Sequence, residues 1–150
     1  MGYSLPSVIF GAVVYSFVDS QYQIRVVIVE GSPIIRVRLS EALSEISNVE
    51  LIAAVDSEQA ALRLLRSSGW NAMVLDLQLK EGTGFGILKA LDVLRPEGAK
   101  VIVFSNYVYP AYRQRCLKLG ADHFFDKARE LHRVRDVLAQ MATSGSSPLP

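Results

Sequence analysis

Short runs of consecutive apolar residues recur along the chain from residue 24 onward, and stretches with helical spacing separate them. Five runs have the length and the β-branched or aromatic content of buried strands; they cover 24–29, 51–55, 72–77, 101–104 and 123–125. Apolar residues three or four apart follow each run and predict an amphipathic helix after every strand. This alternation predicts an α/β fold, a doubly wound five-stranded parallel sheet with helices on both faces.

The regular pattern also sets the expected domain limits. Ser32 and Pro33 are typical of the N-cap and first turn of the helix that follows the first strand. The last helix is expected over residues 128–141. We therefore expect one domain over 24–141, with an apolar extension at 1–23 and a flexible tail at 142–150.

The N-terminal stretch is apolar but differs from a membrane anchor. Residues 5–18 are broken by Pro6 and Gly11, and no Lys or Arg precedes them. A membrane-spanning helix needs about 20 mostly apolar residues, and an anchor is normally flanked by basic residues. We therefore expect an extension that packs on the domain, packs on a partner or stays loose, and a membrane role is disfavoured.

The composition narrows the class of protein further. Among 150 residues, 16 are basic and 15 acidic, which leaves a formal net charge of +1 and gives no support for binding nucleic acid through its phosphates. The single cysteine, Cys116, excludes an intramolecular disulfide and fits a reducing, cytoplasmic location. With only two histidines, a His-rich metal site is excluded.

Candidate chemistry lies at the carboxyl ends of the predicted strands, where open parallel sheets build their sites. Glu30, Asp76, Ser105 and Lys127 stand at four of these ends. Two carboxylates can share a divalent cation, and a carboxylate beside a cation, an ammonium and a hydroxyl can attack a phosphoryl group. Alternatively, Asp76 and Lys127 form a structural ion pair. The residue types alone leave both interpretations open.

The ordered set resembles the receiver domain of bacterial two-component response regulators. The resemblance rests on four segments, in chain order IRVVIVEGSPIIRVRL, MVLDLQLKEGTGFGILKAL, VIVFSN and GADHFFDK. From Glu30 the successive gaps to Asp76, Ser105 and Lys127 are 46, 29 and 22 residues, all similar to those of receivers. Each segment alone is a weak signal, but four in order over residues 24–141 are specific.

The resemblance implies a role for each matching position. Asp76 would accept a phosphoryl group from a histidine kinase or a histidine phosphotransfer protein. Lys127 would pair with that group, and Ser105 would turn toward it after transfer. Phe124 stands at the family's switch aromatic position, three residues before the lysine.

The resemblance also implies a Mg²⁺ site made by Glu30, Asp76 and the backbone carbonyl of Gln78. Receivers usually carry two acidic residues after the first strand, and the second binds the ion directly. Here Gly31 takes the place of that second acid, which puts Mg²⁺ binding in question. Lys80 replaces the usual proline of the loop after Asp76, and we expect its ammonium to point into solvent.

Two functions follow as expectations. The first is a phospho-accepting relay, with no enzymatic activity beyond self-catalysed phosphotransfer and dephosphorylation. About nine residues follow the last predicted helix, too few for a DNA-binding output domain, so the relay is expected to contact a downstream protein target. The second is a phosphorylation-independent adaptor or dimerisation module, in which the apolar extension supports a homodimer.

Overall fold

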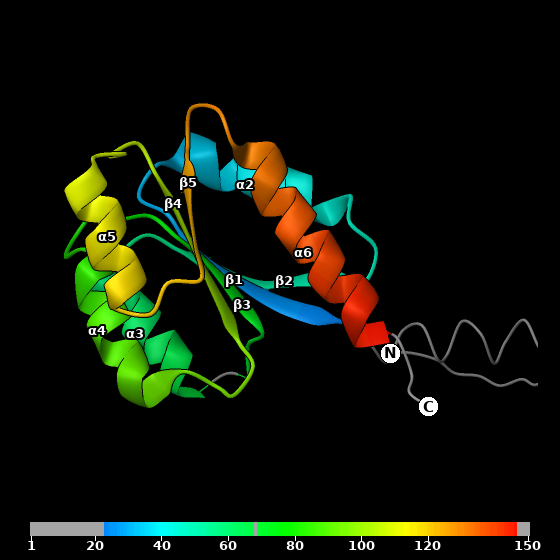
Figure 1. Cartoon of the computed structure of the whole chain (residues 1–150). Coiled ribbons are helices and arrows are strands. Elements are labelled where there is room, and N and C mark those ends of the chain that lie inside the picture. The colour runs from blue at the N-terminus through cyan, green and yellow to red at the C-terminus, as the bar shows by residue number, and fades with distance from the viewer. Residues whose placement is uncertain (1–22, 68, 147–150) are drawn as a thin grey trace, which may run out of the picture.

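The computed structural model describes residues 23–67 and 69–146 (Figure 1). Strands and helices alternate through these residues. In chain order they are β1 (Ile24–Val29), α2 (Pro33–Ser44), β2 (Val49–Val55), α3 (Glu58–Ser67), β3 (Ala72–Leu75), α4 (Gly84–Leu94), β4 (Lys100–Ser105), α5 (Pro110–Lys118), β5 (His123–Asp126) and α6 (Leu131–Ser146).

The five strands form one sheet in the order β2-β1-β3-β4-β5, and every neighbouring pair is parallel. This confirms the predicted α/β fold. The strand order reverses between β1 and β3, which places the carboxyl ends of these two strands at the switch point where such sheets form binding sites.

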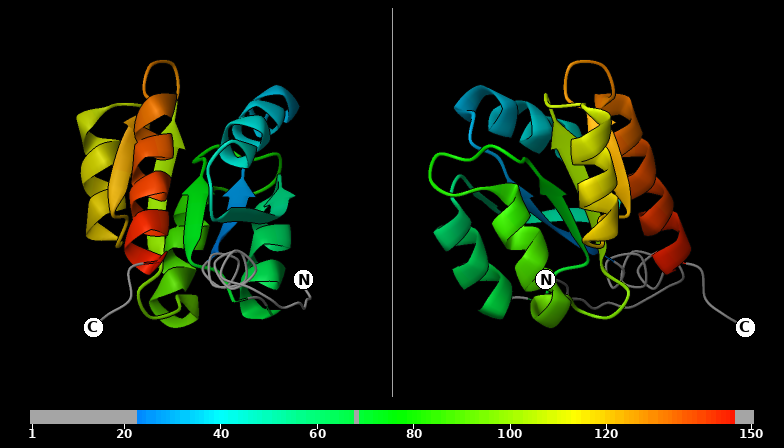
Figure 2. Two further views of the ribbon diagram at one scale, coloured as in Figure 1. Left: turned by 90° about the vertical axis from the view of Figure 1, so that its right-hand side faces the viewer. Right: turned by 60° about the vertical axis from the view of Figure 1, so that its left-hand side comes forward.

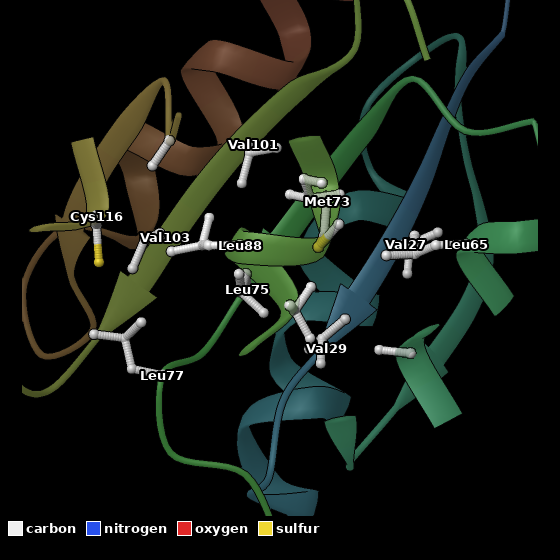
Figure 3. Close-up of a cluster of buried hydrophobic side chains, with 14 of the residues drawn as sticks. Val27, Val29, Leu65, Met73, Leu75, Leu77, Leu88, Val101, Val103 and Cys116 are labelled. Atoms are coloured by element: carbon white, nitrogen blue, oxygen red, sulfur yellow. The ribbon is translucent and has the colours of Figure 1, made fainter. Parts of the chain in front are cut away.

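Helices cover both faces of the sheet, with α2 and α6 on one face and α3, α4 and α5 on the other (Figures 1 and 2). Because side chains alternate along a strand, the odd-numbered residues Val27 and Val29 of β1 face α3, α4 and α5. Leu65, Leu88 and Cys116 of those helices belong to the same buried cluster (Figure 3). The even-numbered residues of β1 belong to the cluster formed with α2 and α6.

The segment between β3 and α4 folds back tightly on itself. The N–H of Gly84, the first residue of α4, donates to the carbonyl oxygen of Leu77 at 2.9 Å. A Cβ at this glycine would overlap the carbonyl oxygen of Asp76 and lie 3.0 Å from the Leu77 Cα. Only glycine therefore fits without moving the backbone of Asp76 and Leu77.

Several element boundaries differ from the sequence prediction. Strand β2 begins at Val49, because Val49 pairs with the first residue of β1, Ile24. Strand β3 ends at Leu75, two residues early, since the chain turns there toward α4. Helix α6 begins at Leu131, after a turn in which Asp126 accepts from the Ala128 and Glu130 amides at 2.8 Å.

Helix α6 also continues beyond the predicted end at residue 141 to Ser146, so the first part of the predicted tail is helical. Most of the predicted extension, residues 1–22, lies outside the described residues. Within the described part of the chain, no helix combines the length and the apolar character needed to cross a membrane.

Candidate functional site

Strand register brings two carboxylates together at the switch point. Ile28 of β1 pairs with Val74 of β3, and both side chains belong to the cluster on the α2–α6 face. Two residues further along each strand, Glu30 and Asp76 continue that alternation, and the Asp76 amide donates to the Val29 carbonyl at 2.8 Å. Both acids are buried. The predicted pair is therefore a direct consequence of the parallel register.

Lys127 lies between these carboxylates. Its backbone N–H donates to the Ser105 carbonyl at 2.9 Å, which extends the β4–β5 pairing by one residue. Its Nζ lies 2.9 Å from Glu30 Oε1 and 3.0 Å from Asp76 Oδ2. The side chains of Lys127, Glu30 and Asp76 are only 7%, 2% and 7% exposed. The three groups form one buried cluster with two negative charges and one positive charge when all are ionised.

Burial raises the pKa of Glu30, the acid that directly follows β1. Loss of solvation raises the pKa of Glu30 from its ordinary value of 4.5 to about 6, and the nearby charge of Asp76 acts in the same direction. The hydrogen bonds from Lys127 and from the Ser32 amide, which donates to Glu30 Oε2 at 2.9 Å, oppose the rise in pKa. Desolvation prevails, so part of the Glu30 population is protonated at mildly acidic pH.

Ser105 is buried, but its hydroxyl serves a different partner. Val101 and Val103 of β4 face the α3–α5 side of the sheet, and Ser105 continues that alternation. Its Oγ accepts a hydrogen bond from the Tyr107 amide at 2.9 Å. The structure thus unites Glu30, Asp76 and Lys127, while the Ser105 hydroxyl is bonded to its own loop.

Phe124, the predicted switch residue, is buried on the same α3–α5 side. The Arg113 guanidinium of α5 lies 5.7 Å from the centre of its ring, and Arg113 Nη1 donates to the Phe124 carbonyl at 3.1 Å. This aromatic side chain is therefore packed in the core and tied to α5.

A pocket of about 320 Å³ opens above the three charged groups. It is lined by Glu30, Gly31, Ser32, Asp76, Gln78, Leu79, Lys80, Asn106, Tyr107 and Lys127. The Tyr107 hydroxyl donates to the side-chain oxygen of Gln78, so these two residues bridge the loops after β4 and β3 at the pocket rim. Sequence analysis missed Tyr107; its only signal was its place two residues after Ser105.

A second layer of polar contacts holds the surrounding loops. Arg36 Nη1 of α2 donates to the Glu30 carbonyl at 2.8 Å and lies 4.0 Å from Asp56 Oδ2. The Asp56 carbonyl in turn accepts from the Lys80 amide at 2.9 Å. Lys80 itself is exposed at the pocket rim, as expected. Arg36 carried no motif; only its position one helical turn after Ser32 placed it beside the site.

The Mg²⁺ ion that the family resemblance implies would need several oxygen ligands at this site. The described residues contain no group of three or more His, Cys, Asp or Glu side chains arranged to hold a metal. The two acids of the site share the Lys127 ammonium, and Gly31 supplies no third carboxylate. As its side chains stand, the predicted set of Glu30, Asp76 and the Gln78 carbonyl does not fit a resident Mg²⁺.

Comparison with known proteins identifies the family. The model of the response regulator receiver domain matches residues 26–139. The chain belongs to this family. Receiver domains are the signalling domains of two-component systems, and phosphorylation and Mg²⁺ binding at the phosphorylation site are typical of them.

Relatives of this receiver include several larger regulators. The Fimbriae Z protein of Salmonella typhimurium is 26% identical over 125 residues, which are 83% of this chain and 59% of that protein. A protein-glutamate methylesterase/protein-glutamine glutaminase of Clostridium acetobutylicum is 29% identical over 77% of this chain and 35% of that protein. The receiver therefore spans less than two thirds of either relative.

Solved structures show the same fold. The signal receiver domain of the putative response regulator NarL from Mycobacterium tuberculosis matches with a TM-score of 0.69 and 22% identity, over 83% of this chain and 96% of that one. The response regulator domain of Thermotoga maritima CheB also matches with a TM-score of 0.69, at 18% identity, over 85% and 99% of the two chains.

Proposed function

We propose that this receiver is a phospho-accepting relay of a two-component phosphorelay in the cytoplasm. Asp76 takes a phosphoryl group from a histidine kinase or a histidine phosphotransfer protein, and the receiver passes the signal on by contact with a downstream protein. One observation carries the proposal: the Asp76 carboxylate lies in an open pocket, 3.0 Å from the Lys127 ammonium.

The two Asp76 oxygens differ in their surroundings. Oδ2 is held by Lys127 at 3.0 Å, whereas the hydrogen bond that Oδ1 accepts within the described residues is a long one of 3.4 Å from the Gln78 amide. Oδ1 is therefore the better placed nucleophile. Its lone pair forms the new O–P bond while the P–N bond of the donor phosphohistidine breaks and the imidazole nitrogen keeps the electron pair. The Lys127 ammonium stabilises the charge on the transferred oxygens.

Phosphorylation would redistribute the contacts of the pocket. A phosphoryl group adds about two negative charges and strong acceptor oxygens, so Lys127 gains a new partner. The Ser105 hydroxyl accepts from the Tyr107 amide, and its own proton can donate to the phosphoryl oxygens when the hydroxyl turns toward them. Because Ser105 is bonded to the loop after β4, that turn moves the loop, and Phe124 repacks with it. Because Arg113 binds both the ring and the carbonyl of Phe124, the change reaches the exposed side of α5.

The test compares two strand-end aspartates. The protein is incubated with acetyl phosphate, and intact-mass spectrometry measures the addition of one phosphoryl group. Wild type and Asp56→Asn are expected to gain the group, because the Asp56 carboxylate lies in the outer layer beside Arg36. Asp76→Asn is expected to gain none. A wild-type protein that stays unmodified, or an adduct that persists in Asp76→Asn, contradicts the proposal.

A phosphorylation-independent adaptor is the second candidate. The observation that favours it is the ion pair of Asp76 with Lys127, which already balances the charge of the Asp76 carboxylate in the absence of phosphate. This function requires that Asp76→Asn leave partner binding intact. If the adaptor acts as a homodimer through its extension, deletion of residues 1–20 lowers the molar mass measured by light scattering. An unchanged mass removes the dimer.

A further inference from the structure

We propose that Lys127 is the resident cation of this pocket, and that the pocket works without a divalent metal ion. Phosphorylation of Asp76 would then proceed when divalent ions are removed. The part about phosphorylation rests on the proposed function; the part about metal binding does not.

The charge balance of the pocket favours the Lys127 ammonium over a divalent ion. The pocket holds two carboxylates, Glu30 and Asp76, and one ammonium within 3.0 Å of both. Its net charge is one negative unit when all three groups are ionised. A Mg²⁺ ion added to this set would leave one uncompensated positive charge among side chains that are 2% to 7% exposed. An excess charge in such surroundings is costly, so the ammonium and the metal compete.

The Lys127 ammonium already occupies the carboxylate oxygens that a metal ion would use. Lys127 Nζ contacts both Glu30 oxygens, at 2.9 and 3.0 Å, as well as Asp76 Oδ2 at 3.0 Å. These are short, charge-assisted contacts in a poorly solvated place, where their loss is expensive. A metal ion that used the same oxygens would first have to break all three contacts and desolvate itself. Mg²⁺ gives up its waters reluctantly, which makes that exchange unfavourable.

The backbone of the loop after Asp76 fills the space beside Gly31. A Cβ at this position would lie 3.0 Å from the Gln78 carbonyl oxygen, 3.3 Å from the Leu79 Cα and 3.4 Å from the Lys80 amide nitrogen. The loop after Asp76 thus closes against the glycine backbone. Gly31 therefore lacks a carboxylate ligand and also lets this loop occupy the place where a side chain would begin. The same loop carries the Gln78 carbonyl that a metal would need.

The experiment measures metal binding directly. Free Mn²⁺, a paramagnetic stand-in for Mg²⁺, is titrated by electron paramagnetic resonance, and the melting temperature is recorded with and without millimolar Mg²⁺. Wild type is expected to bind no Mn²⁺ at the site and to melt at the same temperature in both buffers. Lys127→Met leaves two buried carboxylates without a counter-charge. It is expected to bind Mn²⁺ and to melt at a higher temperature with Mg²⁺.

Two control variants assign the site. Lys118→Met removes an exposed lysine of α5 and is expected to behave like wild type. The double variant Lys127→Met with Asp76→Asn removes one acid together with the ammonium and is expected to lose the gained Mn²⁺ binding. Wild-type Mn²⁺ binding that disappears in Asp76→Asn overturns the proposal, and this result needs no Lys127 variant to fold. A folded Lys127→Met that gains no binding overturns it too.

A second measurement separates this inference from the proposed function. Acetyl phosphate labelling of wild type is repeated with excess EDTA, and the labelling rate is expected to change less than twofold. A strict requirement for Mg²⁺ overturns the metal-free pocket while leaving Asp76 as the acceptor. No labelling under either condition contradicts the proposed function, and the Mn²⁺ titration then still decides the inference about Lys127.

Discussion

Substituting Glu30 with glutamine should remove a defined pH-dependent part of the protein's stability. Burial raises the pKa of Glu30 from 4.5 to about 6 in the folded protein, so the folded state holds this proton more tightly than the unfolded chain. Its contribution to stability is therefore fully present below pH 4.5 and is lost as the pH rises through 6. A shift of this size corresponds to about 2 kcal/mol.

The assay is urea unfolding of wild type and Glu30→Gln at several pH values. The difference in unfolding free energy between the two proteins isolates the Glu30 contribution from the other carboxylates. We expect wild type to lose about 2 kcal/mol relative to the variant between the acidic and the neutral end of the series. Most of the change should fall between pH 4.5 and 6. A difference that stays flat, or that favours wild type as the pH rises, refutes the reasoning.

Glu130 provides a control in which the pKa shift has the opposite sign. Its pKa is lowered, chiefly because its carboxylate accepts a hydrogen bond from the Asp126 amide at 2.8 Å. The stability that it contributes is present above the pKa of the unfolded chain and is lost as the pH falls. The pH dependence of the stability difference should therefore have the opposite direction for Glu130→Gln. The two variants together distinguish an acid whose pKa is raised by burial from one whose pKa is lowered by a hydrogen bond.

Three further outcomes follow from the packing. Gly84→Ala should cost about 1–3 kcal/mol in urea unfolding because its Cβ meets the backbone at the start of α4, whereas Gly69→Ala, with no atom within 4 Å, should have no packing penalty. A double-mutant cycle of Tyr107→Phe and Gln78→Ala should show a coupling of about 0.5–1.5 kcal/mol; strict additivity would contradict their hydrogen bond. Burial raises the pKa of Cys116 to about 11, so Ellman's reagent should label it only after unfolding; rapid labelling of the native protein would contradict its burial.

The acid pair could be predicted from sequence because it depends on strand register. Apolar runs that end in Glu30 and Asp76, placed on neighbouring parallel strands, put the two carboxylates at one edge of the sheet. The position of Lys127 followed from the same rule and from the family resemblance. For such residues, knowing the strand and its last position is enough to place the side chain.

The residues that sequence analysis missed, and the present contact of Ser105, depend on finer geometry. The Ser105 hydroxyl accepts from the Tyr107 amide, a contact that the position of Ser105 at a strand end does not predict. Arg36 and Tyr107 reach the site through side chains that cross between loops, and no spacing along the chain reveals such contacts. The closure of the loop after Asp76 on Gly31 is a backbone contact that only coordinates show.

The Glu30–Lys127 contact joins residues 97 positions apart, and it links the end of the edge strand β5 to the end of the interior strand β1. A growing or truncated chain without β5 would hold two acids at the ends of β1 and β3 with no counter-charge. Such an intermediate would resist burying that edge until the last strand docks. The Lys127 amine thus supplies the counter-charge of both acids only after the last strand has docked, so burial of this acidic edge and completion of the sheet depend on a single side chain.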